Sequence, residues 1–163
     1  MSTLAETVHE HHDQLIPHVD ELLETARLVG TASCEELRPR VLATRAFLTG
    51  TLIPHMEASE RAVYPRLEVL LSDTGALAPL RREHAEVRHL IDELDRLCAA
   101  HGEGPYHRGE ALALRRVLYR LHAIVRVHLD EEEMMIALLG HTKDPEEIAA
   151  VARDLKHAVA VEL

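Results

Sequence analysis

Aromatic residues are scarce in this chain of 163 residues, which has one phenylalanine, three tyrosines and no tryptophan. A hydrophobic core must therefore consist of leucine, valine, isoleucine and alanine. Apolar residues make up 47% of the chain, which is enough for one packed domain. Because strands favour aromatic and β-branched side chains, this composition favours helices over a β-sandwich.

Three further shortages exclude classes of protein. The two cysteines, Cys34 and Cys98, are too few for a disulfide framework and favour reduced thiols in a cytoplasmic protein. Only 18 basic residues stand against 28 acidic ones, and the net charge of -10 disfavours binding to nucleic acid. The chain has no run of 18 apolar residues, so we expect no membrane-spanning helix, and its first residues do not resemble a signal peptide.

Helical periodicity and capping signals divide the chain into helices joined by short loops. Capping boxes begin at Thr3 and Ser33, Pro79 suits a first turn, and Gly30 and Gly140 are natural stops. The pattern predicts helices over about residues 4–29, 33–71, 79–100 and 110–139, and a short one at 145–161. We therefore expect an all-α single domain: an up-down-up-down four-helix bundle over about residues 4–140, with a short additional C-terminal helix.

The chain has thirteen histidines, and four of them recur at matched spacings. His12 and His55 are 43 residues apart, and His84 and His128 are 44 apart. Each of the four lies on the apolar stripe of a different predicted helix, so each is expected to point into the bundle. A single inward histidine is usually an ordinary buried side chain, but one per helix at matched spacing favours a shared site.

A metal ion would satisfy these four rings. Packed together as neutral imidazoles, they would leave buried nitrogens without partners, whereas each ring can bind a metal through one nitrogen and donate from the other. Glu132 follows His128 by four residues, so both side chains can reach one ion. Mixed imidazole and carboxylate ligands favour iron, and neither cysteine lies on the stripe to support a zinc-thiolate site.

The residues at these positions resemble those of the hemerythrin-like, or HHE cation-binding, family. EHHDQLIPHVDEL, LIPHMEASERAVYPRL, EHAEVRHLIDEL and VHLDEEEMMIALL resemble the family's four bundle helices in order. The resemblance implies two iron ions in a non-haem centre, bridged by carboxylates and held at the ends by histidines. Carried over by position, the ligands are His12, His55, His84, His128 and Glu132. It also implies a small ligand, either dioxygen, peroxide or nitric oxide, bound or turned over weakly in stress response or sensing.

Two positions depart from the family pattern. Ser59 stands where a bridging glutamate is expected, with Glu60 next to it and Glu57 close by. Arg88 stands where oxygen-carrying members have a second histidine on the third helix, and His89 follows it. From a regular helix a five-residue step turns about 140°, so Glu60 and His89 would reach the metal only through a π-bulge. This leaves two alternatives, an altered but intact site or a half-degraded one.

The second alternative implies a different class of function, a regulatory or interaction module whose metal site has lapsed. The repeated motif LIPH places Pro17 and Pro54 inside helices, either as tolerated bends or, at Pro54, as a kink that re-aims His55. His18, at the end of the first copy, is a reserve ligand.

Overall fold

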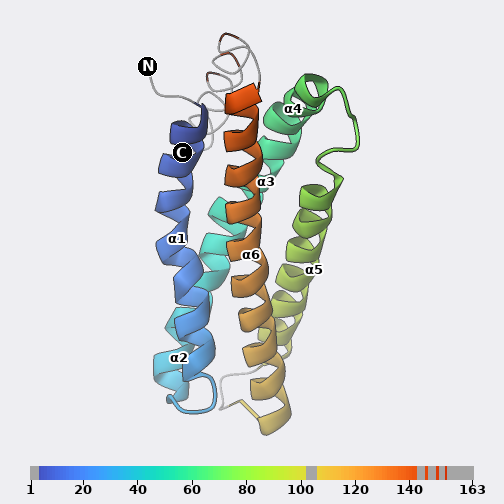
Figure 1. The fold of residues 1–163 in the computed structure, drawn as a ribbon. Coiled ribbons are helices and arrows are strands. Elements are labelled where there is room, and N and C mark those ends of the chain that lie inside the picture. The colour runs from blue at the N-terminus through green and yellow to red at the C-terminus, as the bar shows by residue number, and fades with distance from the viewer. Residues whose placement is uncertain (1–3, 102–105, 143–145, 147–149, 151–152, 154–163) are drawn as a thin grey trace.

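The computed structural model describes residues 4–101, 106–142, 146, 150 and 153, and the described residues contain helices and no strand. Four helical rods follow one another along the chain (Figure 1). Their elements are α1 (Leu4–Leu28), then α2 (Cys34–Phe47), η1 (Leu48–Leu52), α3 (Ile53–Ala58), η2 (Ser59–Val63) and α4 (Tyr64–Leu71) in one rod, then α5 (Ala78–Ala100) and α6 (Arg108–Thr142). The predicted all-α bundle is confirmed.

The rods alternate in direction, and α6 packs against both α1 and α5 (Figure 1). Loops of a few residues join them, as the capping signals predict. Gly30 takes a positive φ of 88° after α1, and the Ser33 side chain accepts a hydrogen bond from the backbone N–H of Glu36 at the start of α2. Most of the helix predicted at 145–161 lies outside the described residues. No helix in the described part of the chain combines the length and the apolar character needed to cross a membrane.

The second rod has two π-helical turns, η1 and η2, and each ends just before an X-Pro pair. The backbone N–H of Ile53 donates to the carbonyl of Leu48, five residues back, and Pro54 follows. Tyr64 donates in the same way to Ser59, and Pro65 follows. A proline inside a helix lacks an N–H and crowds the preceding turn, and a wider turn gives its ring room. The rod therefore stays helical through both prolines.

A polar layer separates two apolar clusters in the core. The larger cluster fills the bundle from Leu15 to Leu129, and the smaller one includes Val8, Val63 and Ile136. Every rod passes from one cluster to the other through buried polar side chains: His12, His55, Ser59, His84, His128 and Glu132. Burying polar groups costs free energy unless they have hydrogen-bond or metal partners. This layer is therefore the part of the core in which a functional site is expected.

Candidate metal centre

The four histidines singled out by spacing meet in the polar layer. His12 and His84 are fully buried, and His55 and His128 are at most 5% exposed. Each comes from a different rod, and Glu132, 2% exposed, comes from α6 one turn after His128. The matched spacings of 43 and 44 residues thus bring four rings and one carboxylate to the same level of the bundle.

Half of this layer is a compact group of His12, His55 and Glu132, whose potential ligand atoms all lie within 4.8 Å of one another. The Oε2 atom of Glu132 is 3.1 Å from Nε2 of His12 and 3.7 Å from Nε2 of His55. Nε2 of His55 and the second carboxylate oxygen of Glu132 are buried without a hydrogen-bond partner. The group thus has the composition and spacing of a three-residue metal site.

The other half pairs His84 with His128, whose Nε2 atoms are 2.9 Å apart. The hydroxyl of Tyr64, a fully buried side chain, lies 3.4 Å from Nε2 of His84. Burial, and then the negative charge of Glu132, raise the pKa of Tyr64. The hydroxyl oxygen of Tyr64 is therefore a third atom in this half that could bind a metal ion. It also lies near the carboxylate of Glu132, which belongs to the other half.

The outer nitrogens of all four rings are held by hydrogen bonds. Nδ1 of His12 lies 3.1 Å from Glu133, Nδ1 of His84 lies 2.7 Å from Glu60, and Nδ1 of His128 lies 2.9 Å from Glu83. Nδ1 of His55 lies 3.0 Å from Nε2 of His11. Ligating histidines in metalloproteins are oriented in this way, with the outer N–H donated to a carboxylate or another acceptor.

These outer bonds determine what the inner nitrogens can do. A carboxylate only accepts, so His84 and His128 each donate Nδ1–H to a glutamate and turn a bare Nε2 lone pair toward the other. His12 likewise faces a carboxylate oxygen with both nitrogens, although a neutral ring has a single N–H. The bare Nε2 atoms of His84 and His128 therefore face each other 2.9 Å apart, and at His12 one of the two contacts, to Glu132 or to Glu133, sets a ring lone pair against a carboxylate oxygen. A cation between these donors would remove both conflicts.

The electrostatics favour a metal ion over a proton. Burial, followed by repulsion from His128, lowers the pKa of His84 to about 4, and burial lowers the pKa of His128 as well. Both rings are therefore neutral near pH 7, with lone pairs available to a metal. Burial alone would raise the pKa of Glu132, but its interactions with His12 and His55 lower it well below its usual range. Glu132 is thus a buried, charged carboxylate that could hold a metal ion.

The distances between the inner nitrogen and oxygen atoms also fit the binding of metal ions. Two donors bound to one ion at right angles, each about 2.1 Å away, are about 3.0 Å apart. The distances of 2.9 Å between His84 and His128 and 3.1 Å between His12 and Glu132 match that separation. The residues of the layer thus fit two metal ions.

Glu60 and His89 do not join the inner group. Glu60 contacts the outer nitrogen of His84 and accepts a hydrogen bond from Arg88, 3.1 Å away, and those two partners lower the pKa of Glu60 against the effect of its burial. The π-turn that the sequence required for Glu60 does exist, but it begins at Ser59, too late to turn Glu60 onto the face of His55. His89 is exposed on α5, which has no π-turn. The reserve residues His18 and Glu57 are also exposed.

Tyr64 belongs to the smaller apolar cluster, but its hydroxyl lies at the edge of the layer beside His84, and sequence reasoning missed it. It follows His55 by nine residues, and on a regular helix that step turns about 180°, to the opposite face. The η2 turn absorbs one residue between them, so the remaining turn is about 80° and the phenol points inward. The one signal in the sequence is Pro65, which marks a place where a regular helix is strained.

A small cavity of about 10 Å³ adjoins the first half of the layer. It is lined by His11, His12, His55, Ser59 and Glu132 on its polar side, and by Val8, Val63 and Ile136 on its apolar side. This volume is about what one water molecule requires. Ser59 is 2% exposed and faces this space, where a longer side chain would fill it.

Comparison with models of protein families identifies the family of this chain. Residues 3–139 match the model of the hemerythrin HHE cation binding domain, a range that contains the first three rods, α6 except its last three residues, and every residue of the layer. Searches of curated proteins and of solved structures returned no match. Since this match covers most of the chain, and the layer has the donors of a cation site, the chain belongs to the hemerythrin HHE cation-binding family.

Proposed function

We propose that this protein binds two iron ions in the polar layer and uses them to bind, or react with, a small ligand. His12, His55 and Glu132 hold one ion. His84, His128 and Tyr64 would hold the other, and Glu132 lies close enough to Tyr64 to influence its hydroxyl. The observation that supports this most directly is the approach of the bare Nε2 atoms of His84 and His128 to 2.9 Å, with both outer nitrogens donating to carboxylates.

Iron suits this donor set. Imidazole nitrogens, a carboxylate and a phenol are the mixed nitrogen and oxygen donors that favour iron over magnesium or calcium, which prefer oxygen alone. Neither Cys34 nor Cys98 contributes to the layer, so no thiolate selects zinc or copper. When bound, iron supplies the redox chemistry and the open coordination positions.

The chain restricts the size of the ligand. The cavity beside His12, His55 and Glu132 has about 10 Å³, the space of about one water molecule, so it restricts a ligand to the smallest molecules and excludes organic substrates. Its apolar wall of Val8, Val63 and Ile136 keeps bulk water away, and the hydroxyl of Ser59 offers a hydrogen bond inside it. Dioxygen, peroxide and nitric oxide meet these limits. A role in oxidative or nitrosative stress response, or in sensing, follows from that ligand class.

The test is to express the full chain with iron supplied, to count the metal, and to record its visible spectrum before and after anaerobic addition of nitric oxide. We expect about two iron ions per chain and a spectral change that saturates with nitric oxide. Because a ligand that binds only the folded state stabilises it, the melting temperature should also rise with iron. A colourless protein that takes up no iron even after anaerobic reconstitution would instead indicate a regulatory module with a lapsed site.

Ser59 provides a separate prediction about the small ligand. Replacing Ser59 by valine should fill the cavity, so we expect nitric oxide to bind at least about 10-fold more weakly while the iron content is unchanged, because an overfilled site rejects even small groups. Ser59→Ala is the matched control, since it removes the hydroxyl but keeps the space. Titration of the iron(II) form with nitric oxide measures both. Unchanged binding in Ser59→Val would show that the ligand enters elsewhere.

A further inference from the structure

The three glutamates that hold outer nitrogens of the inward histidines have different neighbours. Glu133 lies 3.2 Å from the exposed ring of His9. Glu83 lies beside a second carboxyl group, that of Glu131, and the two repel each other. Glu60 instead lies 3.1 Å from a guanidinium group. The negative charge on the outer side of the candidate metal centre is therefore compensated differently from one histidine to the next.

Arg88 and His84 reach the same oxygen atom of Glu60. Its Oε1 atom is 2.7 Å from Nδ1 of His84 and 3.1 Å from Nη1 of Arg88. His84 and Arg88 are four residues apart on α5, so their side chains lie one turn apart on one face of that helix. The two donors therefore share the negative charge of a single carboxylate oxygen.

The hydrogen bond on the outer nitrogen of a histidine affects how strongly its inner nitrogen binds a metal ion. A carboxylate that attracts the Nδ1–H strongly increases the negative charge of the ring, which makes the bare Nε2 atom a stronger donor. A guanidinium group on the same carboxylate neutralises part of its charge and weakens that attraction. The Arg88 side chain is 35% exposed and that of Glu60 29%, so water screens their interaction only in part. Arg88 thus makes His84 a weaker donor.

We propose that Arg88 is a positioning residue that acts through Glu60 on His84 and favours iron(II) over iron(III) in the half of the layer that contains His84. This inference rests on the function proposed above, in which the layer binds iron. An ion of higher charge gains more from a strong donor than an ion of lower charge does, so weakening the donor destabilises iron(III) more than iron(II). Uptake of one electron by iron(III), supplied by an electrode, should therefore occur at a higher potential with Arg88 present than without it.

The test is to measure the iron(III)/iron(II) potentials of the full-length, iron-loaded protein by spectroelectrochemical titration. Arg88→Leu should reduce the equilibrium constant for reduction of one iron ion at least about 10-fold, which is a fall of about 59 mV for one electron, with iron content unchanged. Glu60→Gln offers a neutral acceptor to His84 and should raise that potential. Arg88→Leu added to Glu60→Gln should then have little further effect, because its path to His84 is gone. Arg88→Gln should act as Arg88→Leu does, and it replaces that variant if the leucine protein does not fold.

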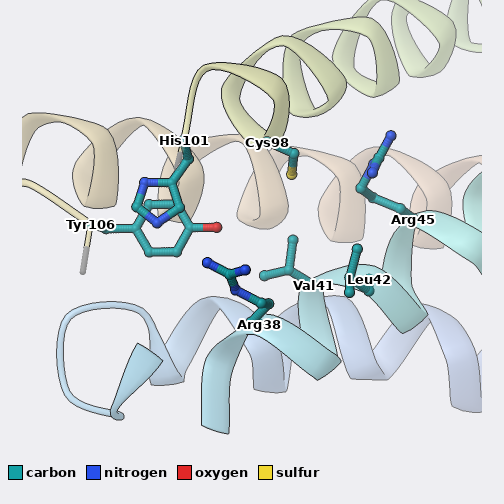
Figure 2. Close-up of a pocket in the computed structure, with 7 residues that line it drawn as sticks. All are labelled: Arg38, Val41, Leu42, Arg45, Cys98, His101 and Tyr106. Atoms are coloured by element: carbon teal, nitrogen blue, oxygen red, sulfur yellow. The ribbon is translucent and has the colours of Figure 1, made fainter. Parts of the chain in front are cut away.

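Arg45→Leu is the matched control, because it also removes a half-buried arginine that is paired with a carboxylate. Arg45 is 34% exposed, its Nε atom is 2.6 Å from Asp95, and it lines a cavity of about 260 Å³ beside α2 and the end of α5 (Figure 2). Asp95 follows His84 by eleven residues on α5, which is about 16 Å along the helix. Loss of this ion pair should therefore leave both potentials unchanged.

A second measurement needs no iron. In nuclear magnetic resonance spectra of the metal-free protein with isotope-labelled histidine, the Nδ1–H proton of His84 should move downfield in Arg88→Leu, because its hydrogen bond to Glu60 is then stronger, and should stay in place in Arg45→Leu.

The outcomes separate this inference from the proposed function. An unmoved Nδ1–H proton, unchanged potentials in Arg88→Leu at full iron content, an equal shift in Arg45→Leu, or an equal effect of Arg88→Leu with and without Glu60→Gln would overturn the inference and leave the proposed function standing. An unaltered protein that binds no iron would overturn the proposed function, and this inference with it.

Discussion

Replacing Glu132 by alanine should reduce the iron content from about two ions per chain to nearly none, because Glu132 is the carboxylate that, among the described residues, groups with His12 and His55 and also influences Tyr64 in the other half. Without it, His12 and His55 remain as two neutral donors, and the His84–His128 pair loses the neighbouring negative charge. Two neutral donors bind a divalent ion weakly in a buried site, since the charge of the ion is then uncompensated.

The measurement is metal analysis after reconstitution, together with the rise in melting temperature on adding iron, which should vanish in Glu132→Ala. Asp130→Ala is the matched control: it removes the same charge from an exposed position two residues away on α6. Its iron content and its melting behaviour should equal those of the unaltered protein. Equal iron in Glu132→Ala and Asp130→Ala would disprove the assignment of Glu132 as a ligand.

Replacing Tyr64 by phenylalanine should abolish a visible charge-transfer band of the iron(III) protein. The hydroxyl of Tyr64 lies 3.4 Å from Nε2 of His84, within the range expected for two donors of one ion. Burial and Glu132 raise the pKa of Tyr64 in the absence of metal, so the phenol is protonated there and gives up its proton only to a strongly charged ion. We therefore expect a phenolate bound to iron in the loaded protein.

Resonance Raman spectroscopy distinguishes this role from a structural one, because phenolate ring modes are enhanced only when the oxygen is bound to the metal. In Tyr64→Phe these modes should disappear, and iron should bind to the His84–His128 half at least about 10-fold more weakly. Tyr119→Phe, at a partly buried position of α6 beside Arg115, is the control and should change neither signal. Phenolate modes that persist in Tyr64→Phe would exclude Tyr64 as the ligand.

The bounds of the helices could be predicted from the sequence because capping residues, glycine and proline act on nearby turns. The first three were predicted to within about two residues, since capping boxes, Gly30 and Pro79 act on the turn in which they lie. The last bundle helix is longer than predicted, Arg108–Thr142 rather than about 110–139. Gly140 does not end it, because glycine permits a left-handed turn without requiring one.

The residues that point into the bundle could also be predicted, because they too follow from local helical periodicity. His12, His55, His84, His128 and Glu132 repeat with the period of a regular helix, and all five are buried as predicted. Glu60, His89 and Tyr64 depended on where the helix departs from that period. The sequence shows prolines that make a π-turn plausible, but the residue at which the turn begins depends on how the whole rod packs.

By itself, then, the sequence determined a four-helix bundle with four inward histidines and one inward glutamate, because helical period and capping depend on near neighbours along the chain. Only the tertiary structure decided which nitrogen of each ring faces inward, that Tyr64 rather than Glu60 lies beside the inner nitrogen of His84, and that Ser59 borders a small cavity. Each of these rests on contacts between residues twenty or more positions apart, or on the exact residue where a π-turn starts. Such contacts exist only once the rods are packed together.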